Sequence, residues 1–213
     1  MRQTFILFSA FMLAITTSCA KSVNLTIDGV VWSSQTSLYL IINEDTANAR
    51  IVPVTDGRFS VSVKVDSHAF VRLHDSKSRP ESSYAVLIPD SRHISFNVED
   101  GTIEGSPLSQ KLHEAIRQVR LASPEGFHID VFSDNEEAWA EARETEKSVR
   151  ASMEENQRKI ILKLIDDNKD NIIPAWIAYC YSKNFHGGID EMTKGAKYKW
   201  LKHPILNRQT TKK

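Results

Sequence analysis

Two cysteines are the residues of this chain with the greatest capacity for covalent chemistry. They are Cys19 and Cys180, and no Cys-x-x-Cys motif occurs anywhere in the sequence. Thiol–disulfide exchange needs a second thiol within reach, because the mixed disulfide must be resolved before the next turnover. The sequence therefore excludes dithiol chemistry of the Cys-x-x-Cys type, and each cysteine has to be interpreted separately.

Cys19 lies directly behind an export signal. The apolar core at residues 5–15 follows a positive charge and is too short to span a bilayer comfortably. Residues 15–19 resemble a bacterial lipobox, in which the cysteine becomes the acylated first residue, although threonine stands where leucine is usual. Cleavage after Ala20 by an ordinary signal peptidase is the alternative. We expect residues 1–18 to be the signal peptide and Cys19 to carry lipid.

Cys180 belongs to an apolar run, Ala-Trp-Ile-Ala-Tyr-Cys-Tyr, at residues 175–181. If Cys19 is acylated, Cys180 is the one remaining thiol of an exported protein in an oxidising compartment. Cysteine is among the most often buried residue types, and reactive cysteines need an exposed, electropositive setting. We therefore predict that Cys180 is a buried structural thiol.

Histidines and carboxylates offer no stronger chemistry. His68, His74 and His93 fall on predicted strands or their ends, without the closely spaced Cys or His pairs of a zinc site. We interpret them as exposed or hydrogen-bonded strand residues. A hydrolase that uses Asp90 or Glu99 is a weaker hypothesis, because carboxylates at strand ends are usually solvated. The sequence therefore predicts no catalytic, metal or cofactor site.

The composition is that of an ordinary globular protein. Of 213 residues, 41% are apolar and 25% are charged, which suits one domain with an appended helical part. Lys plus Arg equals Asp plus Glu at 27 each, so the overall charge gives no reason to expect a nucleic-acid partner.

Short alternating runs predict strands throughout residues 22–105. Asp56-Gly57 between two β-branched runs predicts a hairpin, with glycine supplying a positive φ. Seven or eight short strands with frequent turns predict an antiparallel β-sandwich or barrel at the N-terminal end, followed by helices. We expect the sandwich, so the expected fold class is α+β. Its predicted core contains Phe59, Val61, Val63, Ile94, Phe96 and Val98.

Residues 106–183 have the pattern of helices. Ser106 before proline predicts a capped helix start, and apolar residues then recur at three- and four-residue steps. Ser133 with Glu136 has the form of a capping box, which predicts a long polar helix to about Asn168. Pro174 opens one more helix.

The last segment, residues 184–213, is basic. It carries seven lysine or arginine residues against Asp190 and Glu191: Lys194, Lys197, Lys199, Lys202, Arg208, Lys212 and Lys213. We interpret it as a solvated, frayed tail. Contact with an acidic partner or with lipid headgroups is the alternative.

The order of these parts resembles a known family. A lipobox is followed by Asp-Gly-Arg-Phe at 56–59, Pro-Asp at 89–90, Gly-Ser-Pro-Leu-Ser at 105–109 and Asn-Lys-Asp-Asn-Ile-Ile-Pro-Ala-Trp at 168–176. Together these motifs look like the N-terminal region of Bacteroidetes lipoproteins known as domain of unknown function 4369. In many of those proteins the region precedes a thioredoxin-like disulfide reductase domain of the AhpC/TSA type.

The resemblance implies an accessory region and not the redox chemistry, because the chain contains no Cys-x-x-Cys. We expect a non-enzymatic lipoprotein of the cell envelope that binds an unidentified ligand or a periplasmic protein partner. A truncated thiol-disulfide oxidoreductase without its thioredoxin-like domain is the alternative. The membrane is the expected partner through the lipid on Cys19. No acidic run follows that residue, which favours the periplasmic face over the cell surface.

Overall fold

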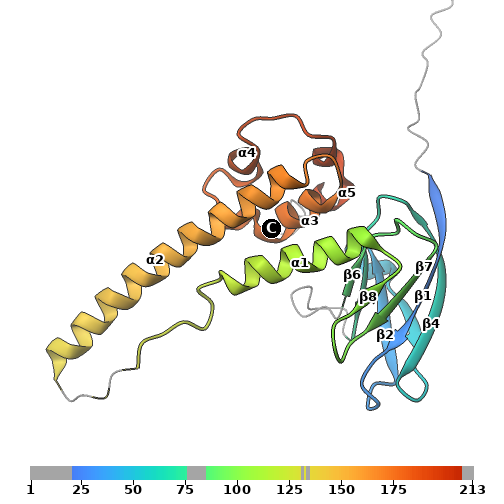
Figure 1. The fold of residues 1–213 in the computed structure, drawn as a ribbon, viewed down its shortest axis with the longest axis horizontal. Helices are drawn as coiled ribbons and strands as arrows, with labels where there is room; N and C mark the ends of the chain where they lie inside the picture. Colours follow the sequence, from blue (N-terminus) through green and yellow to red (C-terminus); the bar gives the residue numbers. More distant parts are fainter. Residues whose placement is uncertain (1–20, 76–84, 131, 133–134, 208–213) are drawn as a thin grey trace, which may run out of the picture.

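The structure is a computed structural model that describes residues 21–75, 85–130, 132 and 135–207. A β-rich half is followed by a helical half, which agrees with the predicted α+β class (Figure 1). Cys19, the predicted signal peptide at 1–18, Ser133 and the basic residues Arg208, Lys212 and Lys213 lie outside the described residues.

Four strands form the first sheet in the order β4-β1-β7-β8. They are β1 (Ser22–Val30), β4 (Arg58–Asp66), β7 (His93–Asn97) and β8 (Ile103–Glu104). β1 pairs with β4 in antiparallel register over nine residues, but it pairs with β7 in parallel register. The prediction of purely antiparallel pairing is therefore wrong for β1 and β7, whose pairing joins residues 67 positions apart and leaves no local signal in the sequence.

The second sheet has the order β3-β2-β5-β6 and is antiparallel throughout. Its strands are β2 (Ser37–Ile42), β3 (Arg50–Pro53), β5 (Val71–His74) and β6 (Ala85–Leu87). Buried apolar side chains from both sheets belong to one cluster, which includes Leu25, Ile27, Leu38, Leu40, Leu73, Leu87, Ile94 and Phe96. The β-rich half thus has one hydrophobic core to which both sheets contribute.

The predicted core is largely correct. Phe59, Val63, Ile94 and Phe96 are buried in the shared cluster, as expected from the period-2 pattern of their strands. Val61 and Val98, which the sequence also places in the core, are only partly buried and pack against this cluster.

The Asp56-Gly57 turn forms, but it does not join a hairpin. Thr55 and Arg58 exchange two backbone hydrogen bonds of 2.9 Å, and Asp56 and Gly57 have φ of 50° and 71°. The strands on either side then part, because β3 pairs with β2 whereas β4 pairs along its whole length with β1. The turn therefore carries the chain from the second sheet to the first, and the predicted hairpin is wrong.

The helical half has its own hydrophobic core. Its helices are α1 (Pro107–Leu121), α2 (Glu136–Asp167), α3 (Ile173–Tyr181), α4 (Gly188–Thr193) and α5 (Pro204–Asn207). Short 3-10 turns occur in this half at η3 (Ser182–Asn184) and η4 (Lys199–Lys202), and a third, η1 (Thr46–Asn48), lies between β2 and β3 of the β-rich half. The core includes Leu112, Val119, Ile161, Trp176, Ile177 and Ile205, and it extends to Phe70, Val86 and Ile88 of the β-rich half.

The start of α1 is a polar junction between the two halves, and it confirms the predicted cap. The Ser106 hydroxyl accepts from the Ser109 backbone N–H at 3.1 Å and donates to the Asp90 carboxylate at 2.5 Å. The Ser109 hydroxyl in turn accepts from the Ile88 N–H at 2.8 Å, while Asp90 accepts from the Leu108 N–H at 2.8 Å. These bonds fix the first turn of α1 to the end of β6.

α2 ends at Asp167 as predicted, but it begins two residues later than expected. Its N-cap is Asn135, whose side chain accepts from the Glu137 N–H at 2.8 Å, and not Ser133. Figure 1 shows the first half of α2 projecting from the rest of the molecule, as suits the polar helix that the sequence predicts. Since this half has few apolar side chains to bury, the helix depends there on polar contacts, including the Glu146–Arg150 ion pair at 2.9 Å.

The segment after Asn184 is folded as far as the structure describes it. α4, η4 and α5 lie in this segment, and their side chains Met192, Trp200, Ile205 and Leu206 are buried in the helical core. Residues 185–207 are therefore packed, in contrast to the frayed tail expected. The high lysine content of this segment led to the prediction of a solvated tail, although apolar residues lie between the lysines and are buried.

Candidate binding face on the first sheet

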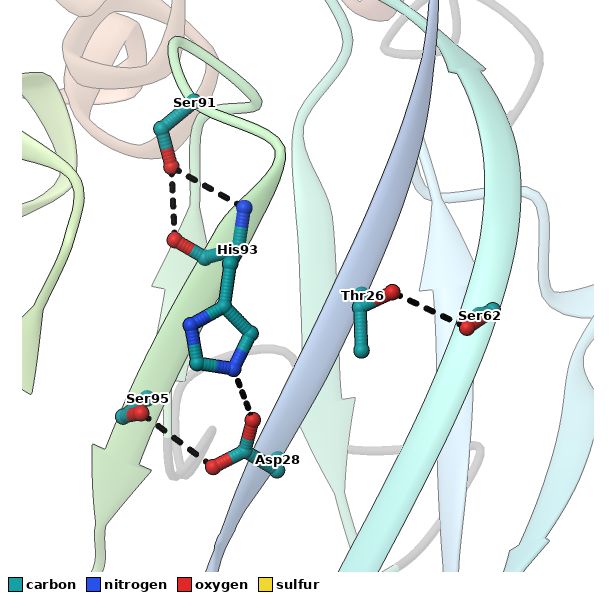
Figure 2. Close-up of polar contacts among 6 residues, drawn as sticks. All are labelled: Thr26, Asp28, Ser62, Ser91, His93 and Ser95. Atoms are coloured by element: carbon teal, nitrogen blue, oxygen red, sulfur yellow. Dashed lines mark hydrogen bonds and ion pairs between the residues drawn. The ribbon is translucent and has the colours of Figure 1, made fainter.

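A band of polar side chains covers the face of the first sheet that points away from the shared core. Along β1, Leu25 and Ile27 are buried, so Thr26 and Asp28 point to the opposite side. Figure 2 shows this face, where Thr26 on β1 meets Ser62 on β4 with their hydroxyl oxygens 3.0 Å apart. Cross-strand polar pairs of this kind keep the face solvated.

Asp28 is the centre of the most connected group on this face. One of its carboxylate oxygens accepts a hydrogen bond from the His93 Nε2–H, and the other accepts from the Ser95 hydroxyl at 3.2 Å (Figure 2). The parallel register of β1 and β7 produces this arrangement, because it places Asp28 opposite Ser95 and Thr26 opposite His93. We call Asp28, His93 and Ser95 the outer-face cluster.

His93 is held from its backbone as well as from its ring. The Ser91 hydroxyl donates to the His93 carbonyl at 2.6 Å and lies 3.3 Å from the His93 N–H (Figure 2). Because Nε2 is hydrogen-bonded to Asp28, Nδ1 is the ring nitrogen that can form a hydrogen bond with a ligand. The imidazole therefore presents one oriented hydrogen-bonding atom to solvent.

A shallow hollow of about 450 Å³ adjoins the cluster at the Asp28 end of the sheet. Its polar lining comes from the ends of β1, β4, β7 and β8 and includes Asp28, Arg58, Ser95, Asn97, Asp100, Thr102 and Glu104. The hydroxyl and backbone N–H of Thr102 bind Asp100 and lower the pKa of its carboxyl group. Three carboxylates and one guanidinium thus line the hollow, which favours a polar ligand that carries hydrogen-bond donors or positive charge.

Gly29 shows how closely the sheet is packed beneath this hollow. A Cβ atom at this position would lie 2.1 Å from the Phe96 carbonyl oxygen and 2.9 Å from the Phe59 ring. Only glycine lets β1 approach β7 and the Phe59 ring so closely. The sheet is therefore closely packed beneath the hollow.

The geometry suits binding better than catalysis. The Ser95 hydroxyl donates to Asp28 and not to the imidazole, so the cluster lacks the serine–histidine contact that nucleophilic catalysis requires. The His93 and Asp28 side chains are 61% and 40% exposed, so water reaches both groups. Electrostatic stabilisation of a transition state is weak in such a solvated place. Across the described ranges, no group of three His, Cys, Asp or Glu side chains is arranged to hold a metal ion.

His68 and His74 are exposed or hydrogen-bonded, as the sequence predicts. His74 is buried, and its Nδ1 lies 2.8 Å from the Asp75 carboxylate. His68 is exposed and lies beside Asp66 at 3.4 Å. The three histidines are therefore in separate places, and only His93 belongs to the candidate binding face.

The two carboxylates of the hydrolase hypothesis are not brought together. Asp90 is bound by Ser106 and by the Leu108 N–H at the start of α1, where it serves as a helix cap. Glu99 is exposed in the turn after β7. Neither carboxylate is part of the outer-face cluster or of the hollow beside it.

The structure overturns the prediction for Cys180, whose thiol is exposed. Residues 173–178 of α3 are buried, and Tyr179 and Tyr181 in the last turn still pack against the helical core. Cys180 lies between these two tyrosines and is the exposed residue of the helix. The apolar composition of residues 175–181 therefore could not indicate which residue is exposed.

The chain was compared with family models, with curated proteins and with solved structures, and no match was found in any of the three comparisons. In the described part of the chain, every helix is too short or too polar to cross a membrane.

Proposed function

We propose that this protein is an exported, non-enzymatic lipoprotein of the cell envelope that acts as a binding or interaction module. In this proposal Cys19 carries the lipid, the protein faces the periplasm, and the β-rich half is a β-sandwich related to domain of unknown function 4369. The observation that carries the proposal is the outer-face cluster: it is oriented, polar and open to solvent, and its serine does not contact the imidazole.

Two observations support the anchor and the sandwich. β1 begins at Ser22, close behind Cys19, so a lipid at Cys19 would hold the first sheet near the membrane without a long linker. Apolar side chains of both sheets share one cluster, which is the packing that face-to-face sheets require.

The chemistry of the hollow indicates the class of ligand. Its carboxylates, from Asp28, Asp100 and Glu104, outnumber the positive charge of Arg58. The open Nδ1 of His93 adds a hydrogen-bonding atom beside them. A polar or cationic group, such as a basic segment of a protein partner, complements this surface.

The alternative, a truncated thiol-disulfide oxidoreductase, gains one favourable observation from the exposure of Cys180. We expect Cys180 to react once with a small thiol reagent in the native protein, and insulin disulfides not to be reduced catalytically, because a resolving thiol is missing. Catalytic turnover that disappears in a Cys180→Ser variant would favour the oxidoreductase instead.

Phase partitioning tests the anchor. We expect the full-length protein, produced in a bacterium with lipoprotein-processing enzymes, to enter the detergent-rich phase of a detergent extract. A Cys19→Ala variant should move to the aqueous phase, and a Cys180→Ala variant, the matched control, should behave as the wild type. Equal partitioning of the wild type and the Cys19→Ala variant would refute the lipid anchor.

A further inference from the structure

Residues 194–207 form a basic segment in a chain whose total charges balance. The segment contains Lys194, Lys197, Lys199 and Lys202 and no Asp or Glu, whereas the whole chain has 27 residues of each sign. All four lysines are exposed. Among the described residues, none of the four forms an ion pair with a carboxylate.

Apolar side chains fix this segment in place. Trp200 and Ile205 are 3% and 0% exposed in the helical core, and Tyr198 stacks on Trp200 with ring centroids 5.6 Å apart. The backbone between the lysines is therefore packed, and its positive charges stand at defined positions on the surface.

Hydrogen bonds connect this segment to the start of the β-rich half. The His203 Nε2–H donates to the His68 carbonyl at 2.6 Å, and the His203 ring lies 4.9 Å from that of Phe70. In the same turn, the Ser67 N–H donates to the Lys21 carbonyl at 3.0 Å. Figure 1 agrees, because α4 and α5 lie on the side of the molecule where β1 begins.

Two of the three acidic side chains in this neighbourhood accept hydrogen bonds from backbone N–H groups. Asp66 accepts from the His68 N–H at 2.8 Å, and Glu191 accepts from the Gly187 N–H at 2.8 Å. Asp190 in α4 is exposed. Together with Lys21, the four lysines of the segment outnumber these acids, and we call these five lysines the basic face.

We infer that the basic face rests on anionic lipid headgroups of the membrane to which the protein is attached. This inference depends on the proposed lipid at Cys19, because two residues of chain span at most about 7 Å and so hold Lys21 close to the bilayer. A headgroup contact near the anchor forms at high effective concentration. Lipid attachment and basic residues commonly act together in this way.

Vesicle co-sedimentation tests the inference without the lipid. The protein beginning at Ala20 keeps every described residue, and it is mixed at low salt with vesicles of phosphatidylcholine or of phosphatidylcholine with one third phosphatidylglycerol. We expect binding to the anionic vesicles only. Each lysine near an anionic surface contributes about a five-fold factor, so changing Lys194, Lys197, Lys199 and Lys202 to Glu should weaken binding about 100-fold or more.

A variant of equal net charge is the control. Changing Lys111, Lys147, Lys159 and Lys163 to Glu alters exposed lysines of α1 and α2, and this variant should keep most of the vesicle binding. Equal losses in both variants would overturn the inference. So would absence of vesicle binding by the wild type, which would leave an acidic protein as the partner for this charge. Neither result bears on the proposed anchor, because the assay contains no acylated protein.

Discussion

The two sheets each carry a charge pair on the face that points away from their shared core, and the pairs lie in opposite environments. On the first sheet, Asp28 and His93 are solvated. On the second sheet, the Arg72 guanidinium binds the Glu44 carboxylate at 2.6 and 2.9 Å, and the two side chains are only 1% and 5% exposed. The same strand pattern thus produces a solvated face on one sheet and a sealed face on the other.

The helical half explains this difference. Val86 lies opposite Arg72 in the register of β5 and β6, and it belongs to the core that the helices build. The second sheet is therefore covered on both sides at this point, whereas the outer face of the first sheet stays open. A charge on the sealed face has to be paired for the fold to form, but a charge on the open face can be retained for binding.

Breaking the buried pair should have the largest effect. An Arg72→Met variant would leave the Glu44 carboxylate buried without its guanidinium, and such losses cost about 3–5 kcal/mol of unfolding free energy. Urea unfolding of the variant measures the loss. Arg58→Met, which removes an exposed arginine beside the hollow, is the control and should cost much less. Equal stabilities of the two variants would contradict the sealed face.

The core shared by both sheets is the next target. Phe96 is 3% exposed, and truncating a large buried aromatic costs about 3–5 kcal/mol, so Phe96→Ala should lower the melting temperature clearly. Phe132→Ala removes a ring that is 98% exposed and should leave the melting temperature near that of the wild type. An unchanged melting temperature for Phe96→Ala would mean that this strand face is wrongly assigned.

The contact between the helical half and the β-rich half at His203 should make the stability of the protein depend on pH. His203 is neutral in the fold, since its Nδ1 accepts from the Ile205 N–H while its Nε2–H donates to the His68 carbonyl. Burial is the main cause that lowers the pKa of His203, and the charge of His68 lowers it further. The hydrogen bond to the His68 backbone and the charge of Asp66 raise the pKa but do not offset the burial. The unfolded chain then binds more protons, so stability is complete above about pH 6.5 and falls as the pH drops below it.

Urea unfolding at pH 7.5 and 5.5 would measure this loss, with pH values chosen about one unit on either side of the ordinary histidine pKa. We expect His203 to account for part of the difference, because the unfolded chain takes up a proton that the folded ring does not bind. A His203→Gln variant should lose correspondingly less stability between the two pH values. The same loss in the wild type and the variant would show that His203 does not contribute.

The open face should contribute least to stability. Asp28→Asn removes the charge of an exposed pair, and such pairs contribute about 0–1 kcal/mol. We expect a change in unfolding free energy below about 0.5 kcal/mol, measured beside Arg72→Met under the same conditions. A loss of the size expected for Arg72→Met would show that the outer-face cluster serves the fold and would remove the reason to regard it as a binding site.

Features set by neighbouring residues could be predicted from the sequence, and features set by distant pairing could not. The cap at Ser106 and the positive φ of Gly57 follow from local chemistry, and both are present. The antiparallel pairing of β4 with β1 joins segments that are distant in the sequence. The contact of Asp28 with His93 depends on the parallel pairing of β1 with β7, which is also distant in the sequence. Arg72 lies in an alternating strand that predicts exposure, and only the helical layer explains its burial.

Mass spectrometry of the mature N-terminus tests the central claim, the lipid anchor, most directly. The protein would be isolated from the membranes of a bacterium that processes lipoproteins, digested, and analysed for its first peptide. We predict that this peptide begins with an acylated Cys19. A peptide that begins with an unmodified Lys21 would show cleavage after Ala20 by an ordinary signal peptidase, and it would contradict the lipoprotein proposal.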